Sequence, residues 1–303
     1  MTNLQTGRIE RLPIEEYHAC AAISHSKLED FRKRPAYFYK KHITKELEQE
    51  DTKSLLIGHA AHTLILEGEA AYLERYFILP EDASDKRTKR YKELAATIPA
   101  GMCELTHDED ALNRKMRDAV MANPVACALL LDERGQAEIT WRIKLTGGIY
   151  LQCRTDWFID SLSECTAKVL RENGIECEAG QPMAMDLKTV RSLEAFQGNL
   201  VNYGYHRADA LYRLIMEPII KRSMPPIIFV GVDTSEPFEC DWGVFSTQDW
   251  ATGYSENTDD FKKLQDCLHE GNFKCKHGSV MKCELPTWYR NKIDRQNGTN
   301  NEY

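Results

Sequence analysis

The chain has 303 residues, of which 42% are hydrophobic and 28% are charged, and its formal net charge is −8 at pH 7. This composition is that of a soluble globular protein long enough to bury a full core. The negative balance argues against a protein that coats nucleic acid non-specifically, but it is compatible with an enzyme that has an acidic metal site and local basic patches.

The sequence also predicts where the protein is located. Its first ten residues are polar and lack the apolar core of a signal peptide, and no apolar run approaches the ~20 residues of a membrane helix. The ten cysteines are scattered and form no Cys-x-x-Cys pair, which is typical of thiols in a reducing compartment. We therefore expect a cytoplasmic protein that does not contact a membrane.

The first part of the chain predicts helices, starting at capping residues or at proline. The expected helices are residues 24–34, capped by Ser24 or Ser26, then 35–41, 54–67, 106–121, capped by Thr106 or Asp108, and 124–132. Residues 81–101 are charged and are expected to be loop-rich with some helix.

Strands dominate the next part. Alternating apolar residues predict strands at 137–145, 149–159 and 183–190, with a Gly147-Gly148 turn in the first hairpin and a charged excursion at 161–182. A long helix at 192–216, strands at 227–233 and 242–246, and a closing helix at 249–269 follow. This order predicts one α/β domain over residues 1–290, with a mixed central sheet flanked by helices, and a flexible tail at 291–303.

Polar side chains gather on one face of two strands that we expect to be neighbours. Alternation in strand 149–159 separates the apolar residues Ile149, Leu151, Cys153, Trp157 and Ile159 from the polar residues Gln152, Arg154 and Asp156. In strand 183–190, Asp186 and Lys188 lie opposite Leu187. Two carboxylates and an amine on adjacent strands offer a hard-cation site with a positive group beside it, which suits metal-assisted phosphodiester hydrolysis.

The Asp-x-Lys tripeptide alone is weak evidence, because it occurs three times in the chain, beginning at Asp51, Asp186 and Asp260. Only the copy at Asp186 lies in a short apolar strand that follows a second acidic strand. The alternative for this copy is a pair of solvated charges on an exposed strand face.

Several segments, in order and spacing, resemble the RecE-type exonucleases (exodeoxyribonuclease VIII) of the PD-(D/E)XK nuclease superfamily. The matching segments are Ile23–Leu28 with Pro35–Tyr37, Gly58–His62, Arg87–Lys89, Glu138, Arg154–Asp156, Asp186–Thr189, Tyr203–His206, Trp250–Tyr254 and Leu285–Trp288. The resemblance covers roughly residues 20–289 and implies a PD-(D/E)XK nuclease core.

The resemblance implies a role for each matching position. Asp156, Asp186 and Lys188 would be catalytic, and the metal ligands would be His62, Asp156, Asp186 and the backbone carbonyl of Leu187, with Glu138 as a further acidic ligand or a plain surface glutamate. The DNA contacts would be Arg154, Arg87, Lys89, Tyr205 and His206. The implied cofactor is Mg²⁺, with Mn²⁺ as a substitute.

The sequence departs from the family at two places. Ala208 stands where relatives carry a glutamine one turn before a tyrosine, here Tyr212, and either Gln197 or His206 could supply the missing polar contact. The excursion at 161–182 makes the gap from Asp156 to Asp186 longer than usual. Some relatives hold an iron–sulfur cluster, but the spacing of Cys267, Cys275 and Cys283 differs from theirs, so we expect no cluster.

The expected activity is the hydrolysis of linear double-stranded DNA from its ends, in recombination. The implied partners are double-stranded DNA, a single-strand annealing recombinase and further copies of the chain in a phage-exonuclease-like ring. Two alternatives stay open: an endonuclease of the same superfamily, and a DNA-binding protein of nuclease fold that has lost catalysis.

Overall fold

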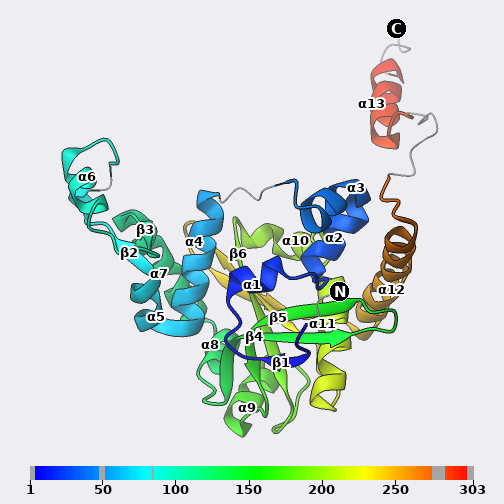
Figure 1. The fold of residues 1–303 in the computed structure, drawn as a ribbon, viewed down its shortest axis with the longest axis horizontal. Helices are drawn as coiled ribbons and strands as arrows, with labels where there is room; N and C mark the ends of the chain where they lie inside the picture. Colours follow the sequence, from blue (N-terminus) through cyan, green and yellow to red (C-terminus); the bar gives the residue numbers. More distant parts are fainter. Residues whose placement is uncertain (1–3, 48–51, 84, 275–283, 299–303) are drawn as a thin grey trace.

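The structure, a computed structural model, describes residues 4–47, 52–83, 85–274 and 284–298. Its centre is a six-stranded sheet of order β1-β4-β5-β6-β7-β8 (Figure 1). The strands are β1 (Gly7–Ile9), β4 (Gly135–Lys144), β5 (Tyr150–Ile159), β6 (Met183–Val190), β7 (Ile228–Asp233) and β8 (Cys240–Gly243). Neighbours are antiparallel except β6 and β7, which run parallel. The predicted mixed sheet is confirmed, and β1 adds an edge strand that the sequence did not predict.

Helices cover both faces of the sheet, and each face has its own hydrophobic core. The first face carries α2 (His25–Lys33), α3 (Pro35–Phe38), α10 (Phe196–Asn202), α11 (Tyr205–Ile220) and α12 (Thr247–Glu270). The second face carries α7 (His107–Ala122), α8 (Pro124–Leu130), α9 (Glu164–Glu172) and the end of α4 (Lys53–His62). The remaining helices are α1 (Ile14–Ala19), α5 (Gly68–Arg75), α6 (Lys89–Ala95) and α13 (Thr287–Gly298).

Side-chain caps decide two of the alternatives in the sequence. Ser24 caps α2 by accepting a hydrogen bond from the Lys27 amide. Thr106 caps α7 in a reciprocal capping box with Glu109. Two predicted helices contain a π-helical turn that the sequence did not predict. The turn Tyr39–Ile43 after α3 carries the first helix two residues past the expected end, and the turn Thr63–Glu67 after α4 ends where the sequence predicted.

A small arm, residues 76–105, projects from the body of the molecule. It consists of the parallel strands β2 (Tyr76–Ile78) and β3 (Cys103–Leu105), a short 3-10 turn at Glu81–Ala83, and α6, which lies at the far edge of the molecule in Figure 1. The arm shares a third hydrophobic core with α4 and α5, formed by Ala60, Leu64, Tyr72, Tyr76 and Leu105. Helix α4 is therefore packed against the arm as well as against the sheet.

The predicted long helix 192–216 is wrong in detail. A 3-10 turn at Leu193–Ala195 leads into α10, and α11 starts only after Gly204. Gly204 adopts a left-handed conformation with φ of 69°, and a Cβ added there would lie 2.0 Å from the Arg207 guanidinium. The left-handed conformation interrupts the helix, and glycine suits this position because the conformation is costly for other residues.

Two further expectations concern the periphery. The excursion at 161–182 contains α9, which begins after its capping residue Ser163. Helix α13 runs across residue 291, where the sequence placed the start of a tail. Among the described residues, no helix is long and apolar enough to cross a membrane.

The contact between α11 and α12 generates a prediction. A Cβ added at Gly253 would lie 2.4 Å from the backbone oxygen of His206, whereas one added at Gly198, on the exposed side of α10, would meet nothing within 4 Å. We expect Gly253→Ala to cost about 1–3 kcal/mol through overpacking. Thermal unfolding should show a clear loss for Gly253→Ala and an equal or higher melting temperature for the control Gly198→Ala, since alanine is the better helix former. Equal melting temperatures for the two variants would contradict the close packing of these helices.

Candidate metal centre

The sheet divides between β5 and β6. The two strands pair only from Trp157↔Met185 to Ile159↔Met183, and beyond Met185 strand β6 continues alongside β7. Asp156 and Asp186 stand at this fork. A carboxylate oxygen of Asp156 accepts a hydrogen bond of 2.6 Å from the buried Leu187 amide. The side chain thereby satisfies a backbone donor near the point where the strand partner is lost.

Three side chains of the kinds that ligate metals meet at the fork. His62, Glu138 and Asp156 each offer one ligand atom, and these atoms lie within 4.8 Å of one another. The His62 Nδ1 atom is 3.8 Å from the Asp156 carboxylate. Burial, reinforced by the Lys188 charge, lowers the pKa of His62 to about 3, so the imidazole is neutral and its lone pair is available. One nitrogen and two carboxylates are a donor set that fits a divalent cation.

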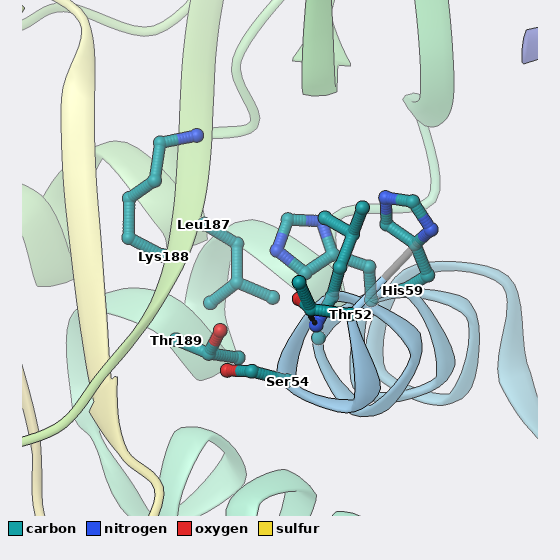
Figure 2. A pocket seen from close by; sticks show the side chains of 9 residues that line it. Thr52, Ser54, His59, Leu187, Lys188 and Thr189 are labelled. Carbon is teal, nitrogen blue, oxygen red and sulfur yellow. Dashed lines mark hydrogen bonds between the residues drawn. The ribbon is translucent and has the colours of Figure 1, made fainter. Parts of the chain in front are cut away.

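Gly58 explains how His62 reaches this position. A Cβ added at Gly58 would be 3.3 Å from the Thr189 hydroxyl, so the glycine lets α4 approach β6 closely. Between α4 and β6 lies a cavity of about 340 Å³, lined by Thr52, Ser54, Leu55, Gly58, His59, His62, Leu187, Lys188 and Thr189. In Figure 2, Leu187 points toward α4, while the ring of His59 points away from β6.

Glu138 reaches the triad through an unusual backbone conformation. Its φ is 57°, in the left-handed region that non-glycine residues rarely adopt. Alternation breaks here, because Ala137 packs into the core of the second face and Ile139 into that of the first. Burial raises the pKa of Glu138, and Arg154, 3.4 Å away, acts to lower it.

The same break corrects the predicted faces of strand β5. Leu151 and Cys153 pack in the core of the first face, whereas Trp157 and Ile159 pack in that of the second. Simple alternation placed all four on one side. The strand changes sides opposite Glu138, a local distortion that a pattern of period two cannot reveal.

Asp186 and Lys188 form an ion pair beside the triad. The Lys188 ammonium contacts the Asp186 carboxylate and lies 3.9 Å from that of Asp156. Burial raises the pKa of Asp186 to about 7, with Lys188 lowering it and Asp156 raising it. Burial acts against the charged form of Lys188, but Asp186 and Asp156 raise its pKa overall, so the lysine stays charged next to the cluster.

Four of the predicted DNA-contacting residues have protein partners, but Arg154 and His206 are largely buried whereas the side chains of Arg87 and Lys89 are exposed. Arg154 is nearly buried, with bonds to Thr140, Glu138 and the Leu12 carbonyl. His206 pairs with Glu256 on α12. In the arm, Arg87 pairs with Asp85 and Lys89 with Glu93.

Tyr205 is the predicted residue of α11 that lies at the site. The Lys188 ammonium is 5.6 Å from the centre of its ring. Ala208, by contrast, is buried in the core of the first face, and Gln197 is exposed. Neither Gln197 nor His206 has a described contact with the fork, so the glutamine of the relatives has no evident substitute among them. Cys275 and Cys283 lie outside the described residues.

Sequence reasoning missed Tyr17. This residue of α1 is buried, and the Arg154 guanidinium lies 4.8 Å from the centre of its ring. Tyr17 thereby supports the arginine that contacts Glu138. Neither α1 nor this contact has a local sequence signal, because the contact joins parts of the chain more than 130 residues apart.

The fold has a counterpart among solved structures. No protein-family profile matches the chain, and no curated protein is significantly similar to it in sequence. The chain is similar to the crystal structure, at 2.19 Å resolution, of a "Putative exonuclease" from Eubacterium rectale, with a TM-score of 0.57 and 12% identity over 96% of this chain and 98% of that one. A likeness to SSO0001, with a TM-score of 0.27 at 13% identity over 91% of this chain and 99% of that one, carries no argument. At such identities the likeness concerns the fold alone, and it agrees with the predicted α/β class, a mixed sheet flanked by helices.

The position of His62 generates a prediction about metal binding. We expect His62→Ala to weaken Mn²⁺ binding about 10-fold or more, with little change in the melting temperature of the metal-free protein. The matched control is His59→Ala, on the same helix but exposed and outside the triad. Calorimetric titration of Mn²⁺ and melting curves in chelator distinguish a metal ligand from a histidine that only packs in the core. Unchanged affinity with a stability loss of ~1–3 kcal/mol would instead identify His62 as a core residue.

The raised pKa of Asp186 predicts a pH-dependent stability. Its folded-state pKa of about 7 lies above the ordinary value, so its protonation stabilises the fold at low pH, and this contribution is lost as the pH rises through 7. Asp186→Asn lacks this titration. In chelator, the melting temperature of Asp186→Asn relative to wild type should therefore rise between pH 4 and pH 8. A difference that does not change with pH would show that Asp186 titrates normally.

Proposed function

We propose that the protein is a Mg²⁺-dependent deoxyribonuclease that hydrolyses linear double-stranded DNA from its ends. The observation that carries this proposal is the donor triad of His62, Glu138 and Asp156 beside the charged Lys188, at the fork of the sheet. A cation site with an ammonium next to it suits the cleavage of a phosphodiester, because negative charge builds up on the phosphate during the reaction.

Each residue has a defined part in this proposal. His62, Glu138 and Asp156 would hold the cation, and Asp186 and the Leu187 carbonyl would be further oxygen ligands at the same fork. Bound Mg²⁺, or Mn²⁺ in its place, supplies polarisation of the scissile phosphate and a more acidic water. Lys188, oriented by Asp186, places its ammonium where it offsets charge on the phosphate. Arg154 pairs with Glu138 at 3.4 Å and would keep its carboxylate in position.

The cavity between α4 and β6 is where the DNA backbone would approach the metal. Its lining includes the hydroxyl residues Thr52, Ser54 and Thr189, together with Lys188. The arm is a weaker candidate for phosphate contact, because residues 76–105 contain five acidic and five basic residues. Arg87 and Lys89 are exposed, and each has one surface ion pair, with Asp85 and Glu93 respectively, that would compete with a phosphate contact.

The finer parts of the proposal rest on the sequence resemblance to RecE-type exonucleases. These are digestion from duplex ends, a role in recombination with a single-strand annealing recombinase, and a ring-shaped homo-oligomer. The name of the Eubacterium rectale protein, whose fold is similar, agrees with exonuclease activity.

Digestion of end-labelled linear duplex beside covalently closed circles, with saturating Mg²⁺, tests the activity. We expect wild type to consume the linear DNA and spare the circles. Asp156→Ala, Asp186→Ala and Lys188→Ala should each lower the rate about 10²-fold or more, because each removes metal ligation or charge stabilisation. Circular dichroism spectra of the three variants serve as the control for correct folding.

The other outcomes separate the alternatives. Nicking or cutting of the circles at a comparable rate would identify an endonuclease. Tight duplex binding with no cleavage in Mg²⁺ or Mn²⁺ would identify an inactive DNA-binding protein. Wild-type turnover in any one of the three alanine variants would remove that residue from the mechanism.

A further inference from the structure

A row of aromatic rings leads from the core of the sheet to the surface beside Lys188. Phe229 on β7 is buried, and Tyr205 stacks on it with ring centres 5.3 Å apart and an interplanar angle of 14°. Tyr203 follows, with its ring centre 6.1 Å from that of Tyr205. The side chain of Tyr203 is 56% exposed, so the row ends in solvent.

The backbone that presents Tyr203 is held in place. Tyr203 follows α10 as its C-cap residue, and the left-handed Gly204 turns the chain sharply into α11. Arg207, which packs over Gly204, is fixed by Glu29, with bonds of 2.6 and 2.9 Å, and by Glu256, with a bond of 2.9 Å. The His25 ring contacts the Tyr203 carbonyl at 3.2 Å. The exposed ring therefore projects from a rigid turn, not from a loose loop.

A single exposed tyrosine is ordinary on a protein surface. What distinguishes Tyr203 is its position relative to the metal centre. The Lys188 ammonium is 5.6 Å from the centre of the Tyr205 ring, and Tyr203 is the next ring outward. The centre of the Tyr203 ring is therefore no farther from the Lys188 ammonium than the sum of these two distances. Stacked bases follow one another every ~3.4 Å along a strand, so a strand with a phosphate at Lys188 reaches Tyr203 within a few nucleotides.

We propose that Tyr203 is a stacking platform for an unpaired nucleobase of the DNA strand whose phosphate lies at Lys188. This inference rests on the proposed function and adds a substrate preference to it. Aromatic side chains bind single strands by stacking, which tolerates any base sequence. A rigid ring loses little conformational freedom on binding, so its contribution to affinity is large for one residue. An end with a short single-stranded overhang therefore binds better than a blunt end.

Fluorescence of 2-aminopurine tests the platform directly, because stacking quenches it. The probe is a duplex with a short overhang that carries 2-aminopurine, bound to the full-length protein with Ca²⁺ in place of Mg²⁺ to prevent cleavage. We expect wild type and Tyr203→Phe to quench the probe, and Tyr203→Ala to lose the quenching and bind the overhang about 5- to 150-fold more weakly. Blunt duplex should bind Tyr203→Ala and wild type alike.

The matched control is Tyr254→Ala, which removes another exposed tyrosine, on the outer helix α12. It should behave as wild type. Mg²⁺-dependent digestion of linear duplex by the same wild-type preparation reports on the proposed function separately. Digestion by wild type with unchanged quenching and affinity in Tyr203→Ala would overturn the platform and leave the nuclease in place. Wild type that neither digests nor binds DNA would overturn both.

Discussion

Where β5 and β6 separate, the buried amide of Leu187 has no strand acceptor, and the carboxylate of Asp156 takes that place. An unpaired buried amide would cost about 1–3 kcal/mol, so the hydrogen bond fixes the carboxylate at the fork. The other members of the site are arranged around it: His62 approaches from α4, Glu138 from the adjacent strand and Lys188 from the far side of the fork. The architecture of the sheet and the chemistry of the site thus depend on the same side chain.

The electrostatics of the site follow from that arrangement. Glu138, Asp156 and Asp186 crowd around one ammonium, and the neutral His62 adds no positive charge. Burial raises the pKa of all three carboxyl groups, which means that the metal-free fold holds their negative charges at a cost. A cation bound by these groups would remove that cost. The site is therefore a place where the protein gives up stability in its metal-free form, as is common where charge is gathered for chemistry.

Local sequence patterns predicted the parts of this site that depend on regular structure. The alternation in β6 placed Asp186 and Lys188 opposite Leu187. His62 was a candidate only through the family resemblance, and it lies on the side of α4 that meets the sheet. The features that the sequence did not predict are local departures from regularity or contacts between distant segments. The left-handed Glu138 reverses the faces of two strands, Gly204 divides a long helix, and Tyr17 reaches Arg154 from an unpredicted helix. Each depends on tertiary contacts, which cannot be predicted from a short stretch of neighbouring residues.

Helix α4 belongs to two cores at once. Ala61 packs with the second face of the sheet, and Ala60 packs with the tyrosines at the base of the arm. Close-packed interiors deform little and transmit strain, so a displacement of the arm would be passed along α4 to His62 at its end. The distance from the imidazole to the carboxylates of Glu138 and Asp156 would then change, although the arm itself contains none of the three candidate ligands.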